Sequence, residues 1–551
     1  YNTSSGISGL SNASVNDVAM TVLPNAPIDS ATGLPVPTIA LGTEGGVSVI
    51  KDDGTVVDIT ATGYTPTDNK IDFDHLNNLL YIENAGFPQR QTIPSDDVSR
   101  STAGVGRDRV YGGTSSYIPT ILGTATNIVP DFHGFVCGST SGLTILDYDS
   151  SQSQEMVAYA ATSYNTGYMV GDIKGAFLSD TDDTNLTGSQ LVTNGDFSNG
   201  TTGWTANNAS LSASSGVLTV NDSAGAGADS QAYRSVTGLT VGKVYNVGVR
   251  HKSNTQHRLW IGTGSGPLNS GTQDVLSQTY NSSYANDWTN DYYTFTASST
   301  SVTVALQVDG NGTAYYNWVY INESVDDDRS INGNPLQVIG TITKSAVATG
   351  AELVSYGPFS TSNRLEQSYN SDLTFGTNDF SIMFWVNHDG SDAHQTIVGR
   401  DDREFNIFLL SKSSYSRKIR VYAHNSSDSV QLFDSTAYPY PINSWTHICV
   451  NYTGGSTCTI YIDGVLDSSG ALDYDIDDTT HKLYVGVRND STDGNVSFPA
   501  TNCKLALLRI SKSAPSAEQV KKIYNDEKHL FNVNAKATLY GSSDTVTALA
   551  F

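Results

Sequence analysis

The stretch FSIMFWVN at residues 380–387 decides the fold of the C-terminal third of this chain. Every second position of it is apolar, namely Phe380, Ile382, Phe384 and Val386, and this is the period of a half-buried strand. The stretch INSWTHICVNYTGGSTCTIYIDGVL at 442–466 predicts two further strands that flank a Thr-Gly-Gly-Ser turn. Together these patterns predict an antiparallel sheet that contains a hairpin.

The segment that follows predicts one more strand and then one short helix. LYVGV at 483–487 and the apolar run at 504–510 both have strand character. Ser516 stands three residues before Gln519, and Val520 and Tyr524 follow at helical spacing. This arrangement predicts a helix whose first turn is closed by a capping box.

The order of these four motifs resembles the concanavalin A-like jelly roll of the laminin G type. The matching parts are the Phe-x-x-x-x-Trp strand, the Ser-Trp-Thr-His-Ile-Cys-Val-Asn-Tyr strand, the Tyr-Ile-Asp-Gly-Val turn and the last strand before the Ala-Glu-Gln-Val helix. The resemblance covers about the last third of the chain. It implies a β-sandwich and a mostly non-catalytic family whose members bind glycans or proteins.

Composition and charge restrict the class of protein and its partners. Charged residues make up 15% of the chain, against about 25% in ordinary soluble domains, and Gly, Ser, Thr, Asn and Tyr are abundant, as is typical of extracellular β proteins. With 551 residues the chain is expected to hold three or four domains. The net charge of −25 argues against a nucleic acid or an anionic membrane as partner. No run is long enough to span a membrane and no signal peptide is visible.

Four cysteines do not make a disulfide framework in a chain of this length. Cys458 shares the parity of Ile460 and Ile462, whereas Cys449 has the parity opposite to Ile448 and Val450. The two thiols of this hairpin are therefore expected on opposite faces of the sheet, where they cannot bond. Free and mostly buried thiols are predicted.

The first 185 residues contain a repeat. Residues 40–50 align without a gap to residues 136–146, and each segment predicts a strand, a tight glycine turn and a second strand. A further apolar strand is expected at 79–82. Repeated meanders of short strands suggest the blades of a propeller.

Residues 539–551 resemble residues 10–22 in having a Ser-rich turn before an apolar strand. The C-terminal segment is therefore expected to return to the repeat domain as a strand, the alternative being a disordered tail. The chain begins at Tyr1 without a methionine and ends inside this predicted strand, which indicates a piece of a longer polypeptide.

The region between these parts begins with LVTNGDFSNGTTGW at 191–204. Strands are predicted after it at 210–220, 245–251, 258–262, 291–297, 302–308 and 315–321. The Asn-Gly-Asp-Phe opening, the Asp-Trp-x-x-x-Tyr-Tyr-Thr-Phe strand and the closing Tyr-Tyr-Asn-Trp-Val-Tyr-Ile strand resemble a jelly-roll carbohydrate-binding module. In that family the closing strand usually carries an acidic residue that helps to hold a structural calcium ion. Asn317 takes its place here, which puts calcium in this module in doubt.

The predicted fold class is all-β, with a propeller-like repeat domain interrupted by two jelly-roll sandwiches. The predicted domains are propeller-like repeats at 1–185, a carbohydrate-binding-module-like jelly roll at 186–325, a linker at 326–340, a laminin G-like jelly roll at 341–531 and a returning strand at 532–551.

Glycan binding requires a flat apolar surface beside a few polar groups. Trp204 and Trp288 stand at positions that are usually core in the family. Trp260 shares its parity with Arg258, whereas Leu259 and Ile261 have the other parity. The predicted glycan site is therefore Trp260 with Arg258, joined by Arg250 and Tyr233 on neighbouring strands, and the alternative is a half-buried strand aromatic.

Two polar clusters, at 400–404 and 488–493, are expected on loops of the laminin G-like module. Carboxylates and amides on loops suit Ca²⁺, which takes six to eight oxygen ligands. The candidate ligands are Asp401, Asp402, Asp490 and Asp493, and the alternative is a pair of solvated turns without a metal.

Enzyme signatures are largely absent from the sequence. It contains no Gly-x-Ser-x-Gly elbow, no His-Glu-x-x-His and no phosphate-binding loop. The pair of carboxylates of a glycoside hydrolase converges in space and has no fixed spacing in sequence. A polysaccharide-degrading enzyme with accessory binding modules therefore stays an alternative.

The sequence favours a non-catalytic adhesin that binds surface glycans, at the cell exterior or on a virion. The repeat domain with lectin-like modules resembles phage tail-fibre and other appendage proteins, also in phrases such as YNTGYMVGDIKGAFLS at 164–179. Further copies of itself or neighbouring fibre subunits are the other expected partners. The remaining alternative is a purely structural component of a virion or cell surface.

Overall fold

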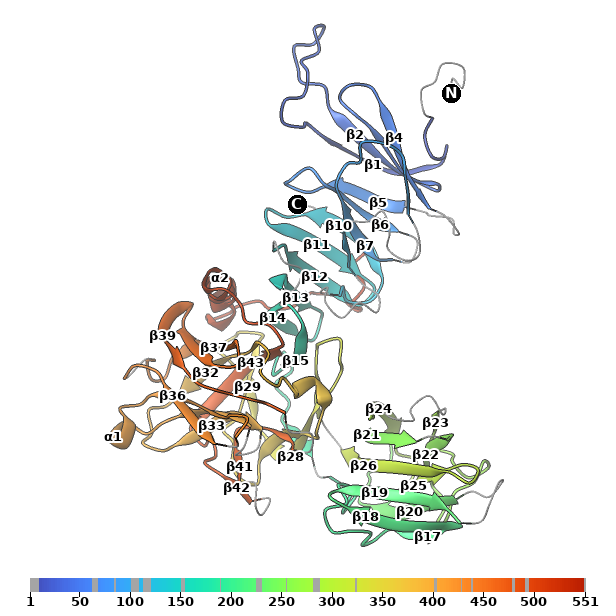
Figure 1. Cartoon of the computed structure of the whole chain (residues 1–551), viewed down its shortest axis with the longest axis vertical. Helices are drawn as coiled ribbons and strands as arrows, with labels where there is room; N and C mark the ends of the chain where they lie inside the picture. The colour runs from blue at the N-terminus through green and yellow to red at the C-terminus, as the bar shows by residue number, and fades with distance from the viewer. Residues whose placement is uncertain are drawn as a thin grey trace.

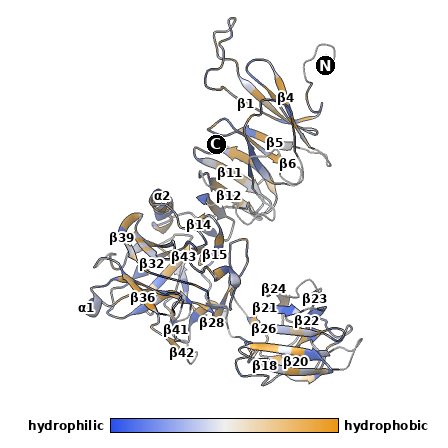
Figure 2. Cartoon of the chain, in the orientation of Figure 1, coloured by the Kyte–Doolittle hydropathy of each residue, from blue (hydrophilic) through white to orange (hydrophobic). Residues whose placement is uncertain are grey.

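The structure is a computed structural model that describes residues 9–549 apart from 62–67, 84–85, 101–108, 112–119, 150–153, 189, 224–229, 254, 281–287, 323–324, 401–403, 428, 438–439, 478–480 and 491–494. Almost all regular structure in these residues is β-strand (Figure 1), and apolar residues lie along the strands of every part of the chain (Figure 2). The predicted all-β class is confirmed. No helix in the described part is both long and apolar enough to cross a lipid bilayer.

The N-terminal part is a row of three sheets (Figure 1). The first contains β1 (Val15–Thr21), β2 (Thr38–Thr43), β3 (Gly46–Ile50), β4 (Val56–Ala61) and β8 (Val98–Arg100). The second contains β5 (Asp68–Phe73), β6 (Leu79–Glu83), β7 (Pro88–Gln91) and β9 (Arg109–Val110). The third contains β10 (Ala125–Pro130), β11 (Gly134–Ser139), β12 (Gly142–Asp147), β13 (Met156–Ala160) and β14 (Asn165–Val170).

The predicted repeat corresponds to two hairpins with the same turn chemistry. Thr43 pairs with Gly46 in the first hairpin, and Ser139 pairs with Gly142 in the second. In each, the hydroxyl donates to the glycine carbonyl, at 2.8 and 3.0 Å. Gly46 and Gly142 have φ of 123° and 137°, a region that a residue with a Cβ rarely adopts. The glycines of the aligned segments are therefore required by the turn.

The second sheet is packed between the other two. Leu79 and Tyr81 of β6 face the first sheet, and Leu80 and Ile82 face the third. Within the described residues the three sheets form a row and no closed ring of blades, so the predicted propeller is not confirmed.

The first jelly roll is a sandwich of two five-stranded sheets. One contains β17 (Thr205–Asn207), β20 (Ser230–Thr237), β25 (Ser301–Val308), β22 (His257–Gly262) and β23 (Leu276–Tyr280). The other contains β18 (Ala209–Ser214), β19 (Val217–Asp222), β26 (Thr313–Asn322), β21 (Val244–Ser253) and β24 (Thr289–Thr296). The predicted strand at 210–220 is a hairpin of β18 and β19, with a turn at Ser215 and Gly216, which both have positive φ.

The second jelly roll has an eight-stranded and a nine-stranded sheet. The eight-stranded sheet contains β29 (Lys344–Ala346), β30 (Val354–Tyr356), β43 (Cys503–Ser511), β32 (Phe380–His388), β37 (Trp445–Thr453), β38 (Thr457–Ile462), β39 (Val465–Ala471) and β15 (Ile173–Phe177). The other contains β16 (Leu186–Gly188), β27 (Val325–Asp326), β28 (Leu336–Ile342), β31 (Arg364–Gln367), β40 (Leu483–Val485), β33 (Gln395–Arg400), β34 (Phe405–Leu409), β35 (Ile419–His424) and β36 (Val430–Asp434). Outside them lie the hairpin of β41 (Arg488–Asp490) and β42 (Asn495–Ser497) and the short helices η3 (Ser371–Leu373), α1 (Lys412–Tyr415) and η4 (Lys528–Phe531).

The motifs that decided the fold lie at its centre. Phe380, Ile382, Phe384 and Val386 of β32 all point into the core between the two sheets. The predicted helix is α2 (Ala517–Glu527), and Ser516 and Gln519 form both hydrogen bonds of its capping box. Cys449 and Cys458 lie in different clusters on opposite faces of their hairpin, and the four cysteines are free and buried. The local predictions for this region are confirmed.

The modules are nested differently from the prediction. β15 pairs with β43, and β16 pairs with β28, so residues on both sides of the predicted boundary at 185 belong to the second jelly roll. The first jelly roll is inserted into the strand sequence of the second, between β16 and β27. A hydrophobic run as short as 173–177 does not reveal which distant strand it will pair with.

The predicted linker at 326–340 is wrong, because these residues form β27, β28 and a buried acidic turn. Asp328 accepts hydrogen bonds from the backbone N–H of Ala176, Ser330 and Asn334, at 2.9, 2.9 and 3.0 Å. Asp326 accepts one from Leu178 N at 2.8 Å. The run of aspartates suggested a solvated segment, but its carboxylates serve as internal acceptors for backbone groups that would otherwise be unpaired.

Asp328→Ala is expected to lower the free energy of unfolding of the second jelly roll by about 2 kcal/mol, because several buried donors lose their acceptor. Asp327→Ala is the matched control, since its side chain is 54% exposed, and it should change stability little. Urea unfolding measures both. Equal midpoints for the two variants would show that the turn is the predicted solvated linker.

The C-terminal segment returns to the third sheet but forms no strand. Leu539 N donates to Ala161 O at 3.0 Å, Val546 N donates to Ser139 O at 2.9 Å, and Asp544 accepts from Thr162 N at 2.8 Å. The described residues from 532 to 549 contain no strand, so the predicted returning strand is wrong. Scattered bonds to loops and strand ends hold the segment instead of a continuous ladder.

Candidate functional site

The predicted glycan platform lies on one sheet, but it is covered. Trp260 and Tyr233 both pair with Ala305, so they are neighbours on the outer face, as predicted, and the Arg258 guanidinium lies 5.5 Å from the Trp260 ring centre. Trp260, however, is only 4% exposed and packs against Leu268. The prediction of an exposed tryptophan platform is wrong.

A buried glutamine fixes the cover over Trp260. Gln231 donates to Leu268 O at 2.7 Å and accepts from Leu268 N at 2.9 Å, which holds the loop after β22 against the sheet. Arg258 forms an ion pair with Asp309 at 2.6 Å. This outer face is therefore a small second core. Strand parity predicts that its side chains point away from the first core, but it does not predict whether another segment covers them.

Arg250 lies on the other sheet, apart from Trp260. Its guanidinium carbon is 4.7 Å from the centre of the Trp288 ring and 3.9 Å from that of Tyr369, which belongs to the second jelly roll. Burial lowers the pKa of Arg250 to about 10, so the group keeps its charge at neutral pH. The predicted four-residue site is thus split, and Arg250 contributes to the contact between the two jelly rolls. Trp204 is core, as expected. Trp288, for which a core position was also expected, is instead half-buried beside Arg250.

Next to Arg250 is a space of about 540 Å³ that we call the intermodule cleft. Its walls include Asn246, Tyr292 and Tyr320 of the first jelly roll and Asp327, Arg329 and Pro335 of the second. On the sheet that contains β21, β24 and β26, several buried polar atoms have no hydrogen-bond partner among the described residues, namely Trp318 Nε1, Asn290 Oδ1 and both polar side-chain atoms of Asn322. Trp318 also stacks on Tyr320, with ring centres 5.7 Å apart.

The predicted calcium ligands cannot be placed. Asp401, Asp402 and Asp493 lie outside the described residues, and only the backbone of Asp490 is described, in β41. Asn317 donates to Gly216 O at 2.9 Å and accepts from Arg250 at 2.9 Å, so its amide is used within the protein. Elsewhere in the described part no three acidic, histidine or cysteine side chains gather as a metal site. The calcium site stays a prediction.

A site that the sequence analysis missed lies on the outer face of the nine-stranded sheet. We call it the aromatic hollow, a cavity of about 220 Å³. It is lined by His394, Phe408, Leu410, Tyr415, Arg420, Tyr422, Leu432, Arg488 and Phe498.

Strand alternation places these side chains in the hollow. Phe405, Ile407 and Leu409 of β34 point into the core, so Phe408 has the outward parity. Ile419, Val421 and Ala423 of β35 are core in the same way, which turns Arg420 and Tyr422 outward. The signal in the sequence is that Phe408 and Tyr422 are aromatic although they stand at outward-facing strand positions, where polar side chains are expected.

Two arginines lie against the aromatic walls. The Arg420 guanidinium carbon is 4.8 Å from the centre of the Tyr415 ring, and that of Arg488 is 5.5 Å from the centre of Tyr422. Arg420 is fixed by two hydrogen bonds to Asp434, at 2.7 and 2.9 Å, which raise its pKa despite partial burial. Arg420 therefore stays a charged donor at the wall of the hollow.

The rings of the hollow are accessible to a ligand. Tyr415 is 39% and Phe498 41% exposed, and His394 contacts both, with ring centres 5.1 and 6.2 Å away. Flat apolar walls with a few fixed donors suit a small ring that has one apolar face and polar edges. A cavity of about 220 Å³ is smaller than the roughly 300 Å³ at which drug-sized pockets begin, so it fits a single unit of a larger ligand.

The comparisons with known proteins agree with the fold of this region. A family model described as "Concanavalin A-like lectin/glucanases superfamily" matches residues 361–521, which contain all nine lining residues of the aromatic hollow. These residues form a lectin-like jelly roll, and the resemblance read from the four motifs is confirmed at this level. No curated protein matches the chain.

Among solved structures, the chain is similar to binding domains of bacterial toxins. The binding domain of Paraclostridial Mosquitocidal Protein 1 is 16% identical, with a TM-score of 0.30, over 36% of this chain and 49% of that one. The receptor binding domain of botulinum neurotoxin C/D mosaic serotype is 13% identical, with a TM-score of 0.29, over 37% and 48%. This chain therefore spans about half the length of each of the two toxin structures.

Proposed function

We propose, from the lectin-like jelly roll at 361–521, that this protein binds a glycan without cleaving it and that the aromatic hollow takes one sugar unit. The observation that carries the proposal is the pairing of exposed aromatic rings with two guanidinium groups, of which Arg420 is held by Asp434, inside a module of lectin-like fold. The rings would pack on the C–H face of a pyranose, and the guanidinium groups would donate to its hydroxyl oxygens.

The lining of the hollow favours binding over hydrolysis. Glycoside hydrolases generally need two carboxyl groups, about 5 to 10 Å apart, on either side of the bond that is cleaved. The described lining contains no Asp or Glu, and the nearby Asp434 is engaged by Arg420. Because the matched superfamily also includes glucanases, a polysaccharide-degrading enzyme is the second candidate function.

The intermodule cleft is a second candidate glycan site. The rings of Tyr292 and Tyr320 line it and would pack on the C–H face of a bound sugar. A ligand there would contact both jelly rolls.

The proposal of an extracellular or virion-surface adhesin, including a place on a fibre, rests on the sequence resemblance alone.

Tyr415→Ala is expected to weaken glycan binding at least about tenfold, because it removes one of the exposed aromatic rings of the hollow and a few aromatic anchors dominate the affinity of a binding site. A glycan array with the full chain identifies the ligand, and calorimetry then measures the affinity of each variant. Phe132→Ala is the control, since Phe132 is an aromatic residue that is 72% exposed on the third sheet. It should bind like the unmodified protein.

Two results would contradict the proposal. If Tyr415→Ala and Phe132→Ala bind every glycan of the array equally well, the hollow is not the site. If oligosaccharides of decreasing length accumulate when the protein is incubated with its glycan, the function is enzymatic.

A further inference from the structure

One wall of the aromatic hollow is formed by a strongly basic segment. Residues 411–420 read SKSSYSRKIR, with four basic residues and no acidic one, in a chain that has 30 basic and 55 acidic residues. Tyr415 and Arg420 of this segment line the hollow, and Arg488 joins them from β41. Positive charge is therefore concentrated at this site, although the chain as a whole is acidic.

The backbone of this segment sets the position of the wall. Leu410 N donates to Lys418 O at 2.9 Å, which closes the loop between β34 and β35. Ser416 and Arg417 have φ of 56° and 52°, so the chain turns sharply directly after Tyr415. The loop thus brings the Tyr415 ring back over the first residues of β35, where the arginine of the wall stands.

Cations outnumber carboxylates among the described side chains at the hollow. Arg420 bonds to Asp434 through Nε and Nη2, and Lys418 Nζ lies 3.9 Å from the same carboxylate. One negative charge therefore faces two positive ones, and Arg488 adds a third cation to the lining. Because the bonds to Asp434 do not use Nη1 of Arg420, this pair leaves that nitrogen for another acceptor.

The net charge of the chain, −25, does not cancel the local excess of cations. At physiological ionic strength the Debye length is about 8 Å, so exposed charges that lie farther away are largely screened. The groups in and next to the hollow therefore decide which charge a ligand meets there. A concave site lined by one sign of charge favours a ligand of the opposite sign.

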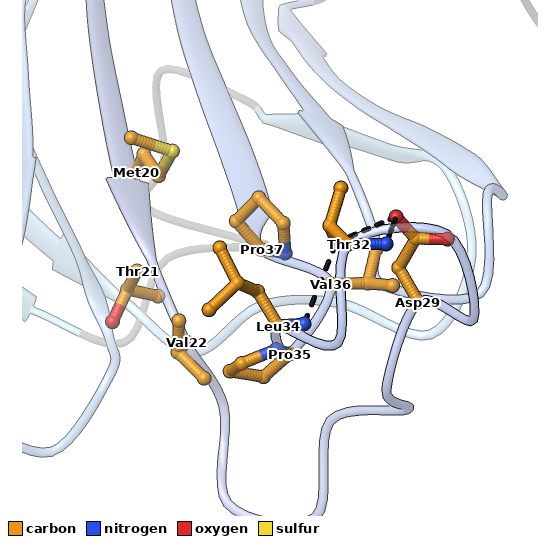
Figure 3. A pocket seen from close by; sticks show the side chains of 9 residues that line it. All are labelled: Met20, Thr21, Val22, Asp29, Thr32, Leu34, Pro35, Val36 and Pro37. Carbon is orange, nitrogen blue, oxygen red and sulfur yellow. Dashed lines mark hydrogen bonds between the residues drawn. The ribbon is translucent and has the colours of Figure 1, made fainter.

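Other cavities of the molecule have a different lining. Figure 3 shows the pocket of about 920 Å³ on the first sheet, which is lined mostly by apolar side chains and has Asp29 as its charged residue. The intermodule cleft has two aspartates, Asp327 and Asp328, beside Arg329. An anionic sugar would meet carboxylates in both places, so it is expected in the aromatic hollow and not in the cleft.

We propose that the sugar unit bound in the aromatic hollow carries an anionic group, which is a carboxylate, as in a uronic acid, or a sulfate ester. The rings of Tyr415 and Phe498 would pack on the apolar face of the sugar, and Arg420 and Arg488 would donate to its anionic oxygens. Charge-assisted hydrogen bonds of this kind are about twice as strong as neutral ones. The inference rests on the proposed function, because it names the class of glycan for the same site.

The test compares each glycan with its uncharged form. A glycan array that holds neutral, carboxylated and sulfated glycans is probed with the full chain, and the bound glycans are expected to be acidic. Calorimetry then compares a bound uronic acid oligosaccharide with its methyl ester, and a bound sulfated oligosaccharide with its desulfated form. The uncharged form should bind at least about tenfold more weakly, because it loses the charge-assisted hydrogen bonds. The two arms show which anionic group the hollow takes.

Arg488→Gln is expected to weaken binding of the acidic glycan at least about tenfold and to change the affinity for its uncharged form by less than about twofold. Arg420→Gln should act in the same direction. Lys504→Gln is the control, because it removes the same single charge from an exposed side chain on β43, in the other sheet of the second jelly roll. This variant should bind like the unmodified chain, and unchanged thermal unfolding would show that each variant folds.

The proposal is overturned if the glycans bound through Tyr415 are neutral, or if the methyl ester and the desulfated form bind as tightly as their parents. It is also overturned if both arginine variants bind the acidic glycan as well as Lys504→Gln does. In these cases the protein still binds a glycan in the hollow, and the proposed function stands. If no glycan of the array binds, or if Tyr415→Ala binds unchanged, the proposed function fails and the inference falls with it.

Discussion

Glu527→Ala is expected to lower the free energy of unfolding of the second jelly roll by about 3–5 kcal/mol, because it leaves a buried guanidinium without its counter-charge. Arg509 is 1% and Glu527 2% exposed. They form an ion pair through the two terminal guanidinium nitrogens, one on each carboxylate oxygen. Glu527 also accepts from Trp385 Nε1 at 2.7 Å and from Tyr168 N at 2.8 Å.

Urea unfolding and hydrogen exchange measure this effect. The amide of Tyr168 should exchange faster in the variant, since its acceptor is lost, and this links the third sheet to helix α2. Glu518→Ala is the matched control, an exposed acidic residue in the first turn of the same helix, and it should cost less than 1 kcal/mol. A loss as small in Glu527→Ala as in Glu518→Ala would contradict the role of the pair.

A decrease in pH from 6.5 to 4 is expected to lower the free energy of unfolding of the first jelly roll through His257. His257 is 0% exposed, and its Nε2 lies 2.6 Å from Nδ1 of His251, which in turn contacts Asp291 at 2.7 Å. Burial, and then the neighbouring His251, lower the pKa of His257 to about 4 from 6.5. The unfolded chain therefore binds a proton between pH 6.5 and 4 that the folded protein does not.

Protonation of His257 therefore favours the unfolded chain over the folded protein. The contribution of His257 to stability is fully present above pH 6.5, falls as the pH decreases toward 4, and its total loss is on the order of 3 kcal/mol. His257→Gln keeps a donor and an acceptor but does not titrate, so its first jelly roll should lose less stability over this range. His75→Gln, at an exposed histidine of the second sheet, is the control.

Urea unfolding of the three proteins at several pH values between 4 and 7 provides the measurement. The difference between the unmodified protein and His257→Gln isolates this group from the carboxylates, which titrate in both. Parallel stability profiles would mean that His257 is protonated equally in the folded and unfolded chain.

Several features were predictable because local residues decide them. The period of two in 380–387 placed Phe380 and Phe384 in the core, and Ser516 with Gln519 fixed the start of α2. The glycine turns of the repeat were visible as aligned residues, and the structure gives them the same hydrogen bonds. Strand alternation also placed Cys449 and Cys458 correctly on opposite faces.

The predicted sites failed where the outcome depends on distant segments. Parity turned Trp260 away from the first core, but Leu268 and Gln231 decided that it is covered. Arg250 was assigned to the platform of Trp260, yet it lies on the other sheet and meets Tyr369. The sequence predicts a linker around Asp326 and Asp328, because their backbone partners at 178 and 176 lie far away in the chain.

The sequence by itself determined the all-β class, the core strands of the second jelly roll, its capped helix and the repeated hairpin, since each depends on contacts between near neighbours or on the two faces of one strand. The tertiary structure alone decided which outward faces are covered, how the jelly rolls are nested, and where exposed aromatic rings gather. The physical reason is that a strand presents two faces, and only the partner that packs on the second face determines whether its side chains form a core or a binding surface.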